Sequence, residues 1–275
     1  MTNKEMNHVH LALDPKQCPE TIEYFKSLKK FDEVSSYELA SNILSCDRTK
    51  AMPPELFAFV VRLYEESISK GNVDAMNDLG ALYYDGRGCC QDFTKAIHYY
   101  EMAASHGNEY AQENLGYCYY YGRDIPVNYE KAFHYFAMGA FCGRLGSLYK
   151  IGDMYRKGYY VEKNPAEAFK IYVRCVELMT HDVVYEIAGP VHLRLGQLYL
   201  YGEGTEKDPS EASRCFQIAE RYLYGMVMSG ELMYRGSLKA AVEGQAKARK
   251  ILMKKLPSRG GRRNEEITPK FRRHR

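Results

Sequence analysis

Glycine and alanine recur through the middle of this chain at a fixed spacing of 36 residues. After an insertion of eight residues the same columns resume, and a weaker fifth copy follows. A period of about 20 to 50 residues is typical of a solenoid, in which each repeat packs against its neighbours. The columns are Gly71, Gly107 and Gly143; Gly80, Gly116, Gly152, Gly196 and Gly230; Gly86, Gly122, Gly158, Gly202 and Gly236; and Ala96, Ala132, Ala168, Ala212 and Ala246.

The pattern within one repeat predicts two helices joined by a short loop. Ala75, Leu79 and Leu82 have helical spacing, and Gly86 predicts the helix end because glycine adopts the left-handed conformation without strain. Twelve residues after the second glycine column stands an Asp or Asn, which caps a helix N-terminus. These caps are Asp92, Asn128, Asn164 and Asp208, followed by Phe93, Tyr129, Pro165 and Pro209; Glu167 and Glu211 complete a capping-box spacing.

The second glycine column falls inside the first helix of each repeat, where glycine costs about 1 kcal/mol relative to alanine. A close approach of the paired helix would offset this cost. We therefore expect the four glycines Gly80, Gly116, Gly152 and Gly196 to pack against the alanine column of the second helices, at Ala96, Ala132, Ala168 and Ala212.

Four segments carry a longer shared motif: AMNDLGALYYDG at 75–86, AQENLGYCYYYG at 111–122, SLYKIGDMYRKG at 147–158 and LRLGQLYLYG at 193–202. The motif resembles the Sel-one-like repeat family, a relative of the tetratricopeptide repeat, over about 71–221 and weakly to about 252. The resemblance implies an α-solenoid and a non-catalytic scaffold that binds proteins or peptides. Some bacterial, cysteine-rich members join each helix pair with a disulfide, but the cysteines of this chain fall at different registers in different repeats.

We expect an all-α, right-handed superhelical solenoid of stacked antiparallel helix pairs. Residues 1–70 are interpreted as an N-terminal cap region with a degenerate repeat at 35–70, and 71–253 as about five repeats. The last 22 residues, 254–275, hold nine Lys or Arg and two Glu, with Pro257 and Pro269 among them. This segment is predicted to be a basic, disordered tail, which either is attracted to nucleic-acid phosphates or is solvated without a dedicated partner.

The remaining composition excludes several function classes. No apolar run approaches the roughly 18 residues of a membrane span, and the N-terminus resembles no secretory signal. Eight cysteines without such a signal favour reduced thiols in a cytoplasm, and we expect a bacterial protein. The chain has no phosphate-binding loop, nucleophile elbow or zinc-protease motif, so we expect no enzyme and no cofactor. Cys89 and Cys90, with His98 as one co-ligand, form too small a set to predict a metal site.

In tetratricopeptide-like stacks the first helices line the concave face, which is the expected binding site for a protein or peptide. Tyrosine and arginine are typical interface anchors. Two interpretations remain open, because these tyrosines either face a partner or pack between repeats. A second column, His98, His134, Lys170 and Arg214, is expected on the outer face of the second helices. The sequence predicts no oligomeric state. The candidate partner-binding residues are Tyr84, Tyr117, Tyr120, Tyr121, Tyr149, Arg156, Lys157, Tyr201, Tyr234 and Arg235.

Overall fold

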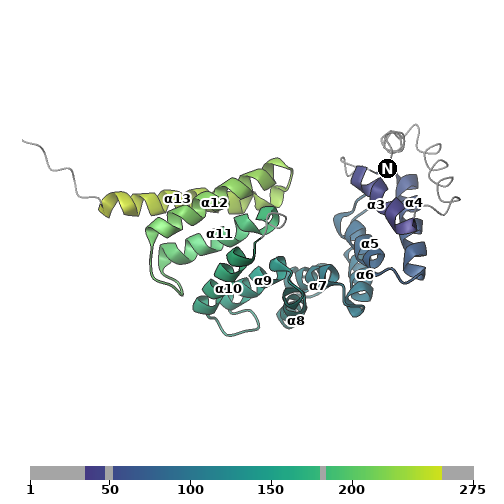
Figure 1. Cartoon of the computed structure of the whole chain (residues 1–275), viewed down its shortest axis with the longest axis horizontal. Coiled ribbons are helices and arrows are strands. Elements are labelled where there is room, and N and C mark those ends of the chain that lie inside the picture. Colours follow the sequence, from purple (N-terminus) through teal and green to yellow (C-terminus); the bar gives the residue numbers. More distant parts are fainter. Residues whose placement is uncertain (1–34, 47–51, 180–183, 256–275) are drawn as a thin grey trace, which may run out of the picture. The chain divides into compact units, whose positions relative to one another are not determined.

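The computed structural model describes residues 35–46, 52–179 and 184–255 (Figure 1). These residues form helices and no β-strand. Residues 1–34 of the predicted cap region lie outside the described residues, as does the predicted tail after Lys255. The helices are α3 (Ser36–Cys46), α4 (Pro54–Ser69), α5 (Val73–Asp85), α6 (Phe93–Ser105), α7 (Glu109–Tyr121), α8 (Tyr129–Phe141), α9 (Leu145–Lys157), α10 (Pro165–Leu178), α11 (Val184–Tyr201), α12 (Pro209–Met228), the 3-10 helix η1 (Leu232–Tyr234) and α13 (Arg235–Lys255).

The chain divides into two compact units, Met1–Ile187 (unit 1) and Ala188–Arg275 (unit 2), and each is described by itself. In unit 1 the two helices of each repeat pack together: α5 with α6, α7 with α8, and α9 with α10. The second helix of one repeat then packs against the first helix of the next, as α6 does with α7 and α8 with α9. The predicted all-α fold of stacked helix pairs is therefore confirmed.

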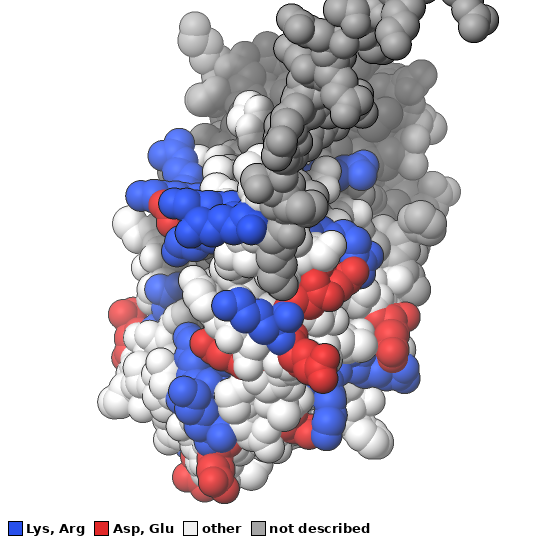
Figure 2. Space-filling model, turned by 90° about the vertical axis from the view of Figure 1, so that its left-hand side faces the viewer, with Lys and Arg blue, Asp and Glu red and all other residues white. Residues whose placement is uncertain are grey.

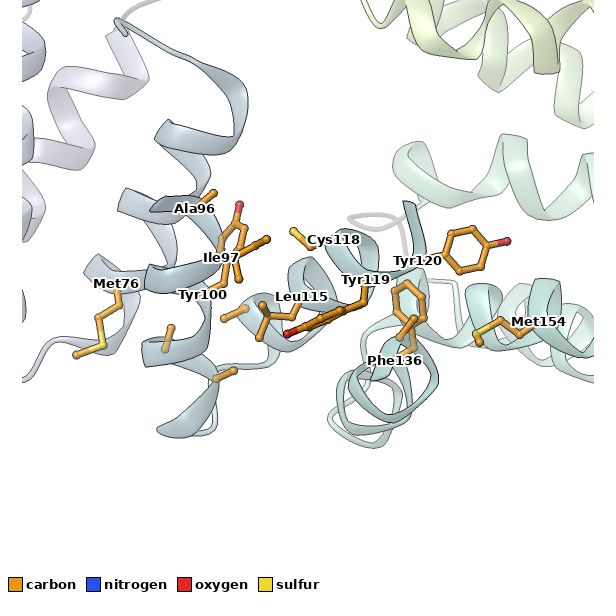
Figure 3. Close-up of a cluster of buried hydrophobic side chains, with 14 residues drawn as sticks. Met76, Ala96, Ile97, Tyr100, Leu115, Cys118, Tyr119, Tyr120, Phe136 and Met154 are labelled. Carbon is orange, nitrogen blue, oxygen red and sulfur yellow. The ribbon is translucent and has the colours of Figure 1, made fainter. Parts of the chain in front are cut away.

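One buried cluster draws on five consecutive helices, α5 to α9 (Figure 3). Leu115, Cys118 and Phe136 are fully buried in it. A second cluster contains residues of α3, α4 and α5. The two helices that precede the first clear repeat therefore share a core with the first helix of that repeat. A continuous core of this kind is expected in a solenoid, because one repeat cannot bury its apolar face alone.

The helix ends follow the local signals in the sequence. Asn128 accepts a hydrogen bond from the backbone N–H of Lys131 at 2.9 Å, and the other three predicted caps act in the same way. Gly122 ends α7 with a φ of +67°. Asn72 and Asn108 also cap α5 and α7, which the sequence pattern did not single out. The recorded bonds of the Glu167 and Glu211 carboxylates run to Lys170 and Arg214 rather than back to the caps.

The column glycines are explained by aromatic rings of the paired helices. A Cβ atom at Gly116 would lie 2.5 Å from the Phe136 ring, which is fully buried. The predicted close approach of the paired helices is confirmed. The side chain nearest to each glycine, however, is an aromatic ring four residues after the alanine column, such as Phe136 after Ala132, and not the alanine itself. The alanines are small and fully buried, which lets the helices approach while the ring covers the glycine. The equivalent pairs Gly80–Tyr100, Gly152–Tyr172 and Gly196–Phe216 have distances of 2.8, 2.7 and 2.8 Å.

Unit 2 departs from the repeat pattern after α12. Gly230, expected inside a first helix, lies in the turn after α12 with a φ of +102°. Gly236, expected to end that helix, lies within α13. The fifth copy therefore forms η1 and one long helix instead of a helix pair. The position of the Asp or Asn cap column holds Val242, which cannot cap a helix N-terminus, and α13 runs through it without a break. Phe216 of α12 packs against both Gly196 of α11 and Gly244 of α13, where a Cβ would lie 2.5 Å away.

Candidate partner-binding face

The predicted site residues are divided between the two units. Tyr84 lies on α5, Tyr117, Tyr120 and Tyr121 on α7, and Tyr149, Arg156 and Lys157 on α9, all in unit 1. Tyr201 ends α11 in unit 2. Tyr234 lies in η1 and Arg235 begins α13. The pattern had predicted that both lie in the first helix of a fifth repeat, and this prediction was wrong.

Lys150 of α9 lies at the centre of the tyrosines that α7 and α9 bring together. Its side chain is buried, and its Nζ atom lies 5.3 Å from the ring centroid of Tyr117. The rings of Tyr120, Tyr121 and Tyr149 are each 5.0 Å from the same atom. Desolvated cation–π contacts are worth about 2 kcal/mol each, so this lysine orders the rings around it. We call these five residues, together with Lys157, the tyrosine face.

The Lys150 ammonium is hydrogen-bonded to a tyrosine hydroxyl, and its counter-charge is the carboxylate of Asp153. Its Nζ donates a hydrogen bond of 2.7 Å to the Tyr121 hydroxyl and lies 4.0 Å from Oδ2 of the buried Asp153. Asp153 in turn accepts a 2.7 Å hydrogen bond from the hydroxyl of Tyr172, the ring that covers Gly152. A buried charge is tolerated only when it is paired and hydrogen-bonded, and this network meets that requirement.

A second polar link joins α7 to the start of α9. Arg144 donates from Nε to Glu113 at 2.6 Å, and its guanidinium lies 4.0 Å from the Tyr110 ring centroid. Glu113 is buried, and its carboxylate occupies the space that a side chain at Gly146 would fill. The first helices of successive repeats are therefore joined by specific polar contacts as well as by the core.

The two interpretations of the tyrosines apply to different residues. Tyr120 and Tyr149 are only 6% and 7% exposed, so they pack between helices. Tyr120 contacts Tyr129, Phe136 and Tyr159, and its hydroxyl accepts from Lys157 at 3.3 Å. Burial raises the pKa of its hydroxyl, which stays protonated. Tyr121 is 47% exposed and presents its ring to solvent.

Arg123, in the loop after α7, covers the other end of this surface. Its guanidinium lies 5.4 Å from the ring centroid of Tyr121, and its Nε donates to the Tyr84 hydroxyl at 3.2 Å. Burial raises the pKa of Tyr84, and the nearby Arg123 lowers it in part. Sequence reasoning missed both Arg123 and Lys150. The available signal for Lys150 was the polar column two residues before the glycines, at Asp78, Asn114, Lys150 and Arg194.

The outer column of the second helices is exposed, and the described part of the chain holds no metal-binding cluster and no helix fit to span a membrane. His98, His134, Lys170 and Arg214 are all exposed on second helices, as predicted. On the face of the molecule in Figure 2, Lys and Arg are interspersed with Asp and Glu. Among the described residues, no cluster of three His, Cys, Asp or Glu could hold a metal ion. No described helix combines the length and apolar character that crossing a bilayer requires.

Comparison with protein families identifies Sel1 repeats at 73–108, 109–140, 146–174 and 191–221. The protective antigen c5321 of uropathogenic Escherichia coli strains, which displays an SLR fold, aligns with a TM-score of 0.52 and 22% identity over 71% of this chain. This chain spans only 42% of that antigen. A Sel1 repeat protein from Oxalobacter formigenes aligns with a TM-score of 0.53 and 22% identity over 66% of this chain and 75% of its own. No curated protein matches the sequence significantly.

Proposed function

Because the chain belongs to the Sel1-repeat proteins, which generally act as protein-interaction scaffolds, we propose that it is a non-catalytic scaffold that binds a peptide segment of a partner protein on the tyrosine face. The observation that carries the proposal is the buried Lys150 at the centre of four tyrosine rings. The prediction of a bacterial, cytoplasmic protein is part of this proposal.

The tyrosine face is suited to binding because its exposed ring is already held in place. Lys150 holds the Tyr121 hydroxyl, Arg123 lies over the ring, and Tyr117 is parallel to it at a centroid distance of 6.2 Å. Ordering a side chain at an interface costs about 0.5–1.5 kcal/mol, and this ring has much of that cost removed beforehand. Preorganised tyrosine is also a frequent interface anchor, since it offers a large area with few rotatable bonds.

The charges beside the ring indicate the chemistry of the partner. The exposed Lys157 and the partly exposed Arg123 place cations on two sides of the surface. A peptide segment that combines a carboxylate with an apolar or aromatic side chain would complement them. The recognition would rest on preformed shape, with no chemical step.

The test compares two exposed tyrosines. Full-length protein, the Tyr121→Ala variant and the Tyr224→Ala variant would be used to capture partners from nuclease-treated lysate, and each recovered partner would then be titrated by calorimetry. Tyr224 is a matched control because it is 57% exposed on α12 in unit 2. We expect Tyr121→Ala to weaken binding at least tenfold with unchanged helical circular dichroism. Equal binding by all three proteins would refute the proposal.

The basic segment 254–275 supports a second candidate, association with nucleic acid. Only Lys254 and Lys255, at the end of α13, belong to the described residues. If this segment contacts phosphates, affinity for DNA should fall steeply with salt and should be lost in a version that ends at Met253. Binding of a protein partner that is equal in the two versions would assign recognition to the solenoid instead.

A further inference from the structure

Six side chains repeat at a spacing of 36 residues on the second helices of unit 1, beyond the residues that the fold requires. The same set of six groups therefore occurs twice: a carboxylate, a hydroxyl, an ammonium, an imidazole, a phenol and a thioether. The first set lies on α4 and α6 and the second on α6 and α8, and we call them the α4–α6 site and the α6–α8 site. The pairs are Glu65 and Glu101, Ser69 and Ser105, Lys95 and Lys131, His98 and His134, Tyr99 and Tyr135, and Met102 and Met138.

The geometry of the α6–α8 site is repeated in the α4–α6 site. Tyr135 is parallel to Tyr119 of α7, with ring centroids 5.7 Å apart, and Lys131 Nζ lies 4.9 Å from the Tyr119 centroid. In the other site the tyrosines Tyr83 and Tyr99 are 5.9 Å apart and parallel within 2°. The ammonium of Lys95 lies 4.9 Å from the Tyr83 centroid, the same distance as in the second copy.

The next repeat shows that helix packing does not demand these residues. Its corresponding positions hold Ala137, Phe141, Glu167, Lys170, Ile171 and Arg174. The glycine, alanine and cap columns nevertheless continue there, and α9 and α10 pack as the earlier pairs do. The two sites are therefore an addition that the packing of the next repeat does without.

The α6–α8 site contains a cavity of about 400 Å³, open to solvent and lined by Glu101, Ala104, Ser105, Lys131, His134, Tyr135 and Met138. Its lining is largely apolar, with Glu101 and Lys131 as its charged members. The Glu101 carboxylate accepts from the Tyr119 hydroxyl at 3.3 Å. In the part of the chain that the structure describes, Lys131 has no carboxylate at ion-pair distance. The lining therefore offers a cation to a ligand, in a cavity of suitable size for an apolar side chain.

One loop residue, Tyr160, lies next to His134 of the cavity lining. Tyr160 has a φ of +65°, where the equivalent loop positions of the other repeats are Gly88, Asp124 and Gly204. A left-handed conformation is costly for a bulky residue, and because it recurs at this position in each of these repeats it belongs to the loop that joins the two helices. The Tyr160 ring is 51% exposed and lies 5.8 Å from the His134 ring, beside the cavity.

We propose that the two sites form a bivalent docking surface, separate from the tyrosine face, for an extended peptide with two aromatic anchors that are each followed by acidic residues. The two sites share α6 and are one repeat apart along the chain. A peptide in the polyproline II conformation returns to the same side every three residues, after about 9.3 Å. We place the two anchors at positions i and i+3, on the same side of the peptide, so that each enters one site and the acidic residues meet Lys95 and Lys131.

The two sites are expected to differ in strength. Lys95 lies 3.6 Å from Oδ2 of Asp92, the cap of α6, which partly neutralises it. The corresponding cap of α8 is the uncharged Asn128. The α6–α8 site should consequently contribute more of the affinity for an acidic peptide.

The test uses a fluorescent peptide with the sequence Phe-Glu-Asp repeated twice, and measures its affinity for the full chain by anisotropy. We expect replacement of one Phe by Gly to weaken binding about tenfold or more, because the second anchor binds intramolecularly. We expect Lys131→Glu to weaken binding about tenfold and Lys95→Glu by less. A peptide with Lys and Arg in place of Glu and Asp should bind poorly.

Two control variants establish whether the peptide binds at this surface or elsewhere on the chain. Arg174→Glu makes the same change of charge on the outer side of α10, and Tyr224→Ala removes an exposed tyrosine from α12 in unit 2; neither should change the affinity. A loss of affinity with Tyr121→Ala would place the peptide on the tyrosine face and would overturn the proposal. Absence of binding, equal binding of the basic peptide, or an equal loss with Arg174→Glu would overturn the proposal. So would affinity that Lys131→Glu leaves unchanged, since the peptide would then bind at another place, for example at the basic segment.

Discussion

Replacing Gly116 with alanine should destabilise the protein, although alanine is the better helix former. The added Cβ would lie 2.5, 2.6 and 3.0 Å from three ring atoms of Phe136, all well inside van der Waals contact. Because the ring is fully buried, it has no solvent-filled space to move into, and α7 and α8 must separate. The same reasoning applies to the three other column glycines, where a Cβ would also meet a buried ring.

The expected magnitude combines two opposing effects. Overpacking a well-packed core costs about 1–3 kcal/mol, and three short contacts place this site toward the upper end. Replacing glycine by alanine within a helix contributes about 1 kcal/mol of stabilisation. The net loss should be about 1–2 kcal/mol, or about 2–8 °C in Tm for a chain of this size. Gly116→Leu places more atoms against the ring and should cost more.

The assay is thermal unfolding followed by circular dichroism, with Gly225→Ala as the matched control. Gly225 lies within α12, and a Cβ there would meet nothing within 4 Å, so alanine should raise the Tm. In a Phe136→Leu background, the loss caused by Gly116→Ala should shrink, because the ring is gone. A Gly116→Ala variant that is as stable as Gly225→Ala would refute the role assigned to the contact with Phe136.

Three further predictions concern local contacts. Asn128→Ala removes the cap of α8 and should lower the free energy of unfolding by about 1 kcal/mol in urea titrations, whereas an unchanged value would show that the cap is dispensable. Burial lowers the pKa of His192 below its ordinary 6.5, so the unfolded chain takes up the proton first and the free energy of unfolding should fall as the pH drops below about 6.5. His192→Asn should flatten this pH dependence of stability, and a variant whose stability changes with pH in parallel with the wild type would contradict the reasoning. Burial also raises the thiol pKa to about 12 in Cys118, about 12 in Cys175 and about 11 in Cys215. Alkylation of these three thiols at pH 8 should therefore be slow in the folded protein and fast in urea, as measured by mass spectrometry of the modified peptides.

The fold was largely predictable because its signals are local or periodic. A cap such as Asn128 bonds to a backbone group three residues away, and a stop such as Gly122 acts through its own φ. These features depend on residues within one turn, so a single sequence contains the information. The family resemblance, which the Sel1 matches confirm, rests on the same columns.

The candidate site was predictable only in part. The pattern placed the tyrosines on the first helices, but it could not separate Tyr121, which is exposed, from Tyr120, which is buried beneath the next repeat. Lys150 was missed because a lysine in a helix is usually solvated. Its burial depends on rings that come from α7, about 30 residues earlier in the chain.

The sequence by itself determined the helix pairs, their caps and the glycine column, because each depends on neighbours within a few residues or on exact repetition. Only the tertiary structure decided that Phe136 covers Gly116, that Gly236 lies within a long helix, and that Lys150 orders four rings. These outcomes depend on side chains that are distant in the sequence and compete for the same volume. Close packing selects one arrangement among them, and no local pattern records that selection.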